Sequence, residues 1–357
     1  MKLSHIVLQN YRNLQYIDLS PSESMNVVFG KNGSGKTSLL EAISYLGLGR
    51  SFRTPKYQYL INNEQEFFAI AADVLRDDSS LHDTLGICRY RNKNIAIKVN
   101  SQNTNRLMDL IDKFCVQVIH PQGVDLILEG PELRRNFIDW GIFYSQTEFK
   151  NSWLNYRKLL SQRNTLIKQK ATFSMFSVWD ELLAEYGEKI DNFRQKYLED
   201  LTSILKENLR LFLPNFEFDF HYQKGWTNGL QLRTVLNSNL EKDSVLGYTF
   251  YGCHRAEIKI KCNNFLASEI LSRGQLKLLV CAMRLSQGQL LKEQTGENCV
   301  YLIDDLSSEL DSNSQQLLLS LIQKLDSQVF ITNINKQLEL PNFKDVLYIN
   351  IEDLTNS

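Results

Sequence analysis

The sequence predicts an α/β protein in which an inserted helical arm interrupts a domain of strands and helices, and three observations support this fold class. An apolar run at residues 25–29 leads through a glycine-rich loop into residues 38–46, where apolar side chains recur at helical spacing. A second apolar run, 300–303, ends in two aspartates. Residues 147–213 repeat apolar side chains at steps of three to four positions or their multiples, with a break near 171–177, which predicts an antiparallel pair of helices.

The other elements are expected from shorter patterns. Apolar runs of strand length, several of them alternating, are bounded by polar turns. A helix is expected from Pro131, because proline is tolerated at the first helical position, and Pro214 ends the helical arm. Further strands are predicted at residues 2–8, 66–73, 84–99, 115–119, 215–235, 258–260, 328–333 and 346–351.

Residues 30–37 match G-x-x-x-x-G-K-[ST], the phosphate-binding loop of nucleoside triphosphatases, and lie between a predicted strand and a predicted helix. Glycines allow the backbone to approach a ligand, and the loop N–H groups and the helix start attract phosphate oxygens. Lys36 would reach the β- and γ-phosphates, and the Thr37 hydroxyl would bind Mg²⁺. The candidate nucleotide-binding residues of this loop are Gly30, Lys31, Asn32, Gly33, Ser34, Gly35, Lys36, Thr37 and Ser38.

The acidic pair Asp304-Asp305 follows the second apolar run and complements the phosphate loop. We expect Asp304 to hold Mg²⁺ directly or through water, and Asp305 to orient or deprotonate the attacking water. Without a metal, two carboxylates at the end of a buried strand would repel each other. Lys36, Asp304 and Asp305 are therefore the candidate catalytic residues.

A third segment, Ser272-Arg273-Gly274-Gln275, has the S-x-x-Q spacing of a capping box and begins an amphipathic pattern. Its glycine would let a ligand approach the exposed N–H groups, and its arginine adds a positive charge. The segment is either an anion site or an ordinary capped helix start.

Other residues leave alternatives open. Arg12, with Asn13 beside it, either contacts nucleotide or is a solvated surface residue. The basic and aromatic loop 50–57 either contacts phosphate and sugar or is solvated. His254 and Arg255, close to a predicted strand, could be catalytic, DNA-facing or merely exposed.

Composition describes an ordinary globular chain of 357 residues with 43% hydrophobic and 23% charged residues. No signal-peptide pattern or long uncharged apolar run is present, so we expect a cytoplasmic protein with no membrane partner. None of the six cysteines lies in a CxxC pair and the five histidines do not cluster, which argues for free thiols and against a zinc site. Because the formal net charge is −1, any surface for nucleic acid must be a local patch.

The order of these motifs resembles the ABC-type ATPase heads of the SMC family, and more specifically its bacterial recombination mediators. The likeness covers the whole chain, and several of its stretches are peculiar to those mediators. The stretches are Tyr11-Arg12-Asn13, Gly30 to Thr37, Gly49 to Arg53, Gly130 to Asp139, Gly252 to Arg255, Leu271 to Gln275 and Ile303 to Asp311.

The resemblance implies an ABC/SMC-type head with a helical arm, ATP and Mg²⁺ as cofactors, and an ATP-dependent homodimer. Each nucleotide would lie between one subunit's phosphate loop and the other's signature segment 272–275, which acts in trans. The dimer would bind double-stranded DNA near gaps and junctions. With RecO and RecR it would help RecA replace single-strand-binding protein, in replication and SOS-linked gap repair. Loop 50–57 and strands 89–98 then become candidates for DNA contact.

The chain departs from the ABC pattern at two catalytic positions. Asp305 stands where a glutamate is usual, and Thr332-Asn333 stand where a switch histidine is expected. Both departures suggest slow hydrolysis, with ATP serving as a timer that holds the dimer together. The resemblance implies a weak, DNA-stimulated ATPase that acts as a dimerisation switch. The glutamine-loop residue is either Gln117 or Gln122, and Gln122 is taken as the third candidate metal ligand beside Thr37 and Asp304.

The predicted division assigns residues 1–125 and 214–357 to the ATPase domain and 126–213 to the helical arm. One alternative function is the ATPase subunit of a transporter, which the missing switch histidine and the long helical insert disfavour. Another is a structural arm protein such as a true SMC, but that would require hundreds of heptad-patterned residues.

Overall fold

The computed structural model describes residues 1–76, 82–306, 310–336 and 340–355. Internal contacts divide the chain into two units: unit 1 comprises residues 1–123 and 273–357, and unit 2 comprises residues 124–272. Residues 307–309, within the Ser-Glu-Leu-Asp turn of the sequence pattern, lie outside the described residues.

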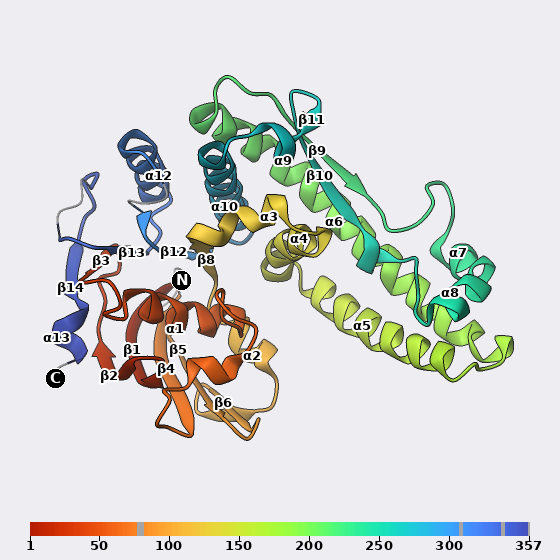
Figure 1. Cartoon of the computed structure of the whole chain (residues 1–357), viewed down its shortest axis with the longest axis horizontal. Coiled ribbons are helices and arrows are strands. Elements are labelled where there is room, and N and C mark those ends of the chain that lie inside the picture. Colours follow the sequence, from red (N-terminus) through yellow and green to blue (C-terminus); the bar gives the residue numbers. More distant parts are fainter. Residues whose placement is uncertain (77–81, 307–309, 337–339, 356–357) are drawn as a thin grey trace. The chain divides into compact units, whose positions relative to one another are not determined.

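Unit 1 contains a five-stranded sheet in the order β14-β3-β13-β12-β8, and all neighbouring strands are parallel (Figure 1). Its strands are β3 (Met25–Phe29), β8 (Val116–Ile119), β12 (Val300–Ile303), β13 (Val329–Asn333) and β14 (Val346–Asn350). The central strands β3, β13 and β12 are buried along nearly their whole length because helices cover both faces of such sheets. The sheet's helices are α1 (Lys36–Leu48), α10 (Arg273–Thr295), α12 (Ser312–Lys324) and the C-terminal α13 (Ile351–Thr355).

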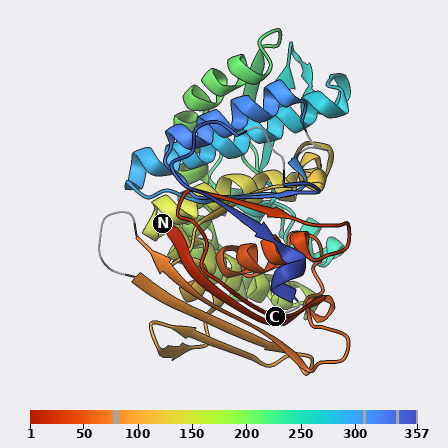
Figure 2. The ribbon, with the colours of Figure 1, turned by 90° about the vertical axis from the view of Figure 1, so that its left-hand side faces the viewer.

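A second sheet of unit 1 is antiparallel and has the order β2-β1-β4-β5-β6-β7. Figure 2 shows these strands, red to orange, as long curved ribbons side by side. They are β1 (Lys2–Tyr11), β2 (Leu14–Leu19), β4 (Phe67–Leu75), β5 (His82–Tyr90), β6 (Ile95–Val99) and β7 (Gln102–Thr104). Alternate residues of β4 are buried, and the Phe68 ring lies 5.4 Å from the Tyr45 ring of α1. The sheet therefore packs its apolar face against the helix that follows the phosphate loop.

Unit 2 is mainly helical. The predicted helical pair is confirmed as α5 (Thr147–Lys168) and α6 (Ser177–Phe212), which lie side by side (Figure 1), and α4 (Pro131–Ser145) begins at the expected proline. Beside them lies a small sheet of β9 (Phe218–Gln223), β10 (Glu257–Cys262) and β11 (Phe265–Leu266). The shorter helices are α3 (Asp125–Leu128), α7 (Leu232–Ser238), α8 (Leu240–Leu246) and α9 (Ala267–Ile270).

The structure differs from the sequence prediction within residues 214–272. A strand was expected over residues 215–235, but β9 covers only Phe218–Gln223. The last residues of the expected strand belong to α7, because Leu232, Val235 and Leu236 are buried at helical spacing. The sequence placed residues 214–272 with the ATPase domain, whereas their contacts group them with the helical arm. The reason is that β9 packs on α6 and β10 packs on α4.

Two composition-based expectations can be compared with the structure. All six cysteines are free thiols, and five of them are buried. Within the described part of the chain, no helix is long and apolar enough to span a bilayer.

Candidate functional site

The phosphate loop lies between β3 and α1, at the edge where the parallel strands of unit 1 end. The first intrahelical bond of α1 runs from Leu39 N–H to the Gly35 carbonyl (3.0 Å), so the N–H groups of residues 36–38 lack intrahelical acceptors. The Lys36 Nζ donates to the carbonyls of Gly30 (2.6 Å) and Lys31 (2.8 Å). Burial lowers the pKa of Lys36, and the nearby carboxylates of Asp305 and Asp304 oppose that shift. The loop therefore presents N–H groups and a cation, the combination that binds phosphate.

Gly35 is the loop glycine for which the structural requirement is clearest. Its φ of 109° lies in the region that favours glycine, and a Cβ there would lie 2.6 Å from Leu14 Cδ2 and 3.1 Å from Asn13 Nδ2. Any other residue would displace the turn that contains Asn13. That turn is tied to the loop, because Asn13 Nδ2 donates to the Gly33 carbonyl (3.2 Å) and Asn13 Oδ1 accepts from Ser38 Oγ (2.9 Å).

Arg12 lines the cavity beside the phosphate loop, and its side chain is only 21% exposed because an ion pair with Glu41 holds it. Its guanidinium forms two hydrogen bonds with the Glu41 carboxylate of α1, from Nε to Oε2 and from Nη2 to Oε1 (2.7 Å). Glu41 is 0% exposed, and it also accepts from Ser51 Oγ and lies 3.9 Å from Arg53 Nη1. One buried carboxylate thus holds Arg12, Ser51 and Arg53 together.

Sequence reasoning missed Glu41. A signal was present, because a carboxylate within the nearly all-apolar segment 38–46 requires a buried partner. The partners, however, come from the β1–β2 turn and from loop 50–57. Their proximity depends on the tertiary fold.

Asp304, which follows β12, contacts the phosphate loop, as predicted. Thr37 Oγ1 donates to the Asp304 carboxylate (2.9 Å to Oδ1), and Thr332 Oγ1 at the end of β13 donates to the same oxygen (2.8 Å). Burial raises the pKa of Asp304, the two hydroxyl donors lower it, and the neighbouring Asp305 raises it further. Asp304 is therefore a desolvated carboxylate that a cation would stabilise.

The spacing of these oxygens fits Mg²⁺. Two adjacent ligands of an octahedral magnesium with bonds of about 2.0–2.1 Å lie about 2.9 Å apart. Thr37 Oγ1 and Asp304 Oδ1 are 2.9 Å apart. The described residues contain no cluster of three or more His, Cys, Asp or Glu that could hold a metal without further ligands. Phosphate oxygens and water would complete the shell, as is usual for magnesium.

Asp305 has a strained backbone, with φ 54° at a residue other than glycine. Its N–H donates to Thr332 Oγ1 (2.7 Å), so Thr332 contacts both aspartates. Thr332 and Asn333 occupy the end of β13, where the ABC pattern has a switch histidine. Neither side chain has the imidazole needed to exchange a proton with a phosphate near neutral pH.

These groups surround a cavity of about 440 Å³ in unit 1. Its lining includes most predicted site residues and four that were not predicted as such: Arg53, Thr332, Asn333 and Ile334. The predicted residues in the lining are Arg12, Asn13, Asn32, Gly33, Gly35, Lys36, Thr37, Ser38, Asp304 and Asp305. Of the other predicted residues, Gly30 and Lys31 contribute carbonyls to Lys36, and Lys31 N–H donates to Glu352 of α13 (3.0 Å).

Two glutamines were candidates for the glutamine loop, and their positions differ. Gln117 lies inside β8, is 1% exposed, and donates to Gln287 (3.2 Å) while accepting from Arg284 (3.3 Å). Gln122 is exposed and follows the end of β8, at the strand edge where Asp304 lies. Its placement suits a residue that approaches a bound metal, although it does not line the cavity.

The signature segment does not line the cavity either. Helix α10 begins at Arg273, and the apolar residues expected after it, from Leu276 to Met283, are buried on one side. Ser272, Arg273 and Gly274 are exposed. The segment is thus on the surface, where a second molecule could reach it.

A phosphate loop, an acidic strand end and a parallel sheet with ordered polar residues at one edge define a P-loop nucleoside triphosphatase with an ABC-type head. The model of the RecF/RecN/SMC N-terminal domain family matches residues 2–349. The chain belongs to this family of SMC-type ATPases, and within it to the RecF proteins.

Individual relatives that bear the RecF name match nearly the whole of this chain. The DNA replication and repair protein RecF of Shewanella frigidimarina is 39% identical over 337 residues, which cover 94% of this chain and 93% of that protein. RecF of Vibrio atlanticus is 40% identical over 335 residues, with 94% and 93% covered. A solved structure described as the recombination mediator protein RecF with ATP has a TM-score of 0.88 at 30% identity, covering 98% of this chain and 96% of that one. An Smc head bound to the C-winged helix domain of ScpA has a TM-score of 0.58 at 14% identity and shares the fold.

Proposed function

We propose that this protein is an ATP-dependent recombination mediator that acts in DNA replication and repair. The observation that best supports nucleotide chemistry is the contact between Thr37 and Asp304, which joins the phosphate loop to the acidic strand end at the spacing of two magnesium ligands. The names of its relatives support the biological role.

ATP would bind with its phosphates against the loop N–H groups and Lys36. Thr37 and Asp304 would hold Mg²⁺, with Gln122 as a further candidate ligand, and the ion would neutralise charge on the phosphates. Asp305 would orient the attacking water. Because Asp305 is one methylene shorter than glutamate and Thr332-Asn333 stand where a switch histidine is expected, we expect slow hydrolysis. We also expect DNA to stimulate this hydrolysis.

ATP would also join two copies of the chain. The exposed residues Ser272, Arg273 and Gly274 and the half-buried Gln275 would contact the γ-phosphate held by the partner's phosphate loop, so each nucleotide would be shared. The dimer would bind double-stranded DNA near gaps and junctions in the cytoplasm. RecO and RecR would be its partners, and RecA loading would be the outcome.

The test compares Lys36→Met with Lys344→Met, whose side chain is 86% exposed and distant from the loop in sequence. Nucleotide titration and light scattering with Mg-ATP and gapped duplex are the measurements. We expect Lys36→Met to lose nucleotide binding and dimerisation together, and Lys344→Met to keep both. Dimerisation of Lys36→Met with ATP would refute the switch, and a wild-type protein that stays monomeric at all concentrations would refute the proposal as a whole.

The transporter alternative gains no support from the structure described here. It predicts co-purification of the protein with membranes, which fractionation of a cell extract would detect.

A further inference from the structure

A small surface of unit 2 holds two cations against one aromatic ring. Lys242 Nζ of α8 lies 3.7 Å from the centroid of the Phe250 ring and 4.8 Å from that of Tyr251, and Arg255 Cζ lies 5.3 Å from the centroid of Phe250. We call these four residues the Phe250 surface. Cation–π contacts at such distances fix the positions of both charges while leaving them accessible.

Neither cation is neutralised by a carboxylate of the residues that the structure describes. Lys242 and Arg255 are exposed, and neither forms an ion pair with a carboxylate among residues 1–76, 82–306, 310–336 and 340–355. Two partly exposed lysines of the same unit do have acidic partners, since Lys189 pairs with Glu185 (2.9 Å) and Lys206 pairs with Asp219 (3.0 Å). The Phe250 surface therefore offers two fixed positive charges to an external anion.

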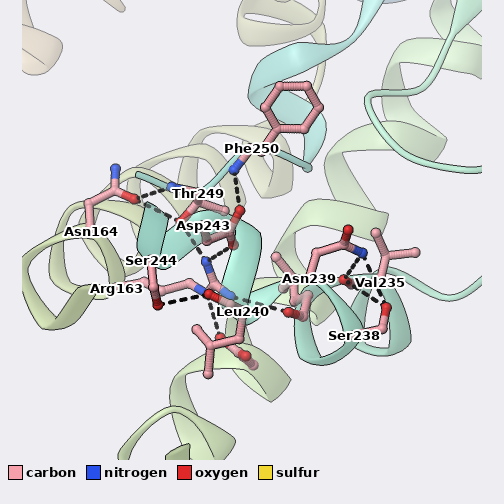
Figure 3. A network of polar contacts seen from close by, with 12 residues as sticks. Arg163, Asn164, Val235, Ser238, Asn239, Leu240, Asp243, Ser244, Thr249 and Phe250 are labelled. Atoms are coloured by element: carbon pink, nitrogen blue, oxygen red, sulfur yellow. Dashed lines mark hydrogen bonds and ion pairs between the residues drawn. The ribbon is translucent and has the colours of Figure 1, made fainter. Parts of the chain in front are cut away.

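A buried polar network holds this surface in place, and Figure 3 shows it from close by. Arg163, which is 0% exposed, donates to Asp180 (2.7 Å), to Asp243 Oδ2 (2.6 Å) and to Thr249 Oγ1 (2.8 Å). Asp243 Oδ1 in turn accepts from the Phe250 N–H (2.9 Å). A buried ion pair contributes little net stability compared with apolar packing, so its main effect here is to fix where the segment 243–250 lies.

The residues that precede Arg255 are equally constrained. His254 Nε2 lies 3.1 Å from the Thr249 carbonyl, which can only accept, so Nε2 carries the proton and Nδ1 accepts from the Tyr156 hydroxyl (2.7 Å). Burial lowers the pKa of His254 to about 4, so the ring is neutral near pH 7. Gly252 has φ 145°, and a Cβ there would collide with the Tyr156 hydroxyl. His254 is thus a structural residue, and Arg255 is the one that the segment exposes.

We propose that Lys242 and Arg255 bind backbone phosphates of the DNA. This inference rests on the proposed DNA binding and adds a contact site in the helical unit. The sequence left Arg255 open as catalytic, DNA-facing or merely exposed, and it gave Lys242 no role. Fixed cations beside an aromatic ring suit a sugar–phosphate backbone, and phosphate contacts of this kind position DNA without reading its sequence. The alternative ligand of the Phe250 surface is an acidic surface of another protein.

The experiment measures affinity for a gapped duplex against salt concentration, with Mg-ATP present, for wild type and for Lys242→Gln/Arg255→Gln. Each lost phosphate contact lowers the slope of log K against log salt by about 0.9, so the double variant should lose about 1.8 units of slope. The loss should be the same for duplexes of different sequence. The matched control Lys189→Gln/Lys206→Gln removes two partly exposed cations that already have acidic partners, and it should leave the slope unchanged.

The outcomes of this experiment distinguish failure of the proposed function from failure of the inference about the Phe250 surface. If wild type does not bind DNA, the proposed function fails. If wild type binds and the double variant keeps its full slope and affinity, the Phe250 surface does not contact DNA, and this inference is overturned. Should the double variant fold poorly, as judged by circular dichroism, each single variant serves instead, with an expected loss of about 0.9 units, and an unchanged slope in both would overturn the inference.

Discussion

The buried carboxylate of Glu41 gives the sharpest test of how the nucleotide site is organised. Glu41→Gln keeps the volume of the side chain but removes the charge that receives two hydrogen bonds from Arg12 and lies 3.9 Å from Arg53. Hydrogen bonds to a charged group contribute about 1.5–3 kcal/mol each. Because the Arg12 side chain is 21% exposed, water replaces part of that contribution, and we expect a loss of about 2 kcal/mol in the free energy of unfolding. For a unit of this size that corresponds to a fall in Tm of about 4–8 °C.

The same substitution should weaken ATP binding through Arg12. If a displaced arginine loses one phosphate contact worth about 1.4 kcal/mol, the Kd for ATP rises about tenfold. Titration with a fluorescent nucleotide measures this, and it is repeated in an Arg12→Gln background. Since Glu41 is argued to act by positioning Arg12, its effect on the Kd should largely disappear there.

An equal loss of ATP affinity in both backgrounds would refute this reasoning, because Glu41 would then act by a route that does not involve Arg12. Glu23→Gln is the control for removal of a carboxylate. Glu23 is 60% exposed and contacts Lys2 at 3.2 Å, so both the Tm and the Kd should stay close to wild type.

Three further predictions concern the acidic pair and the signature segment. Asp304→Asn should raise the Tm of the nucleotide-free protein at pH 7, because burial raises the pKa of Asp304 and the ionised form is disfavoured. That gain should shrink as the pH falls towards the raised pKa, where Asp304 takes up a proton itself; a gain that is constant from pH 8 to pH 5 would contradict the argument. Asp305→Asn should slow ATP hydrolysis by at least about tenfold, because general-base catalysis contributes at least that much to the rate, and it should lengthen the life of the dimer. Phosphate release measures the rate and light scattering measures the dimer. An unchanged rate would remove the role assigned to Asp305. Ser272→Arg should leave ATP binding by the monomer nearly intact and block dimerisation, whereas loss of binding by the monomer would argue against action in trans.

Local patterns in the sequence predicted much of the site. The loop of residues 30–37 is contiguous, and its chemistry depends on glycine conformations and a helix start that the neighbouring residues themselves set. Asp304 and Asp305 were also predicted from neighbouring residues, because a run of apolar residues followed by two acids indicates the end of a buried strand. The helical pair of unit 2 was predicted from its long periodic pattern, which short elements such as α7 do not provide.

Other parts of the site depend on residues far apart in the chain. Thr332 contacts Asp304 across 28 positions, and Thr37 contacts it across 267. Both contacts arise because parallel strands place their carboxyl ends at one edge of a sheet, in an order that no short pattern specifies. Gln117 illustrates the converse, since the fold buries this candidate ligand against Gln287 and leaves Gln122 as the candidate.

The sequence by itself determined that this chain has a phosphate loop, an acidic strand end and a helical insertion. Each of these features consists of consecutive residues with a strong local preference for one backbone structure. Only the tertiary structure decided that Glu41 joins Arg12 to loop 50–57, that residues 214–272 pack with the helical arm, and that Lys242 and Arg255 flank one ring. These relations come from the packing of distant segments, which depends on the shape of the whole unit and not on the preference of any one segment.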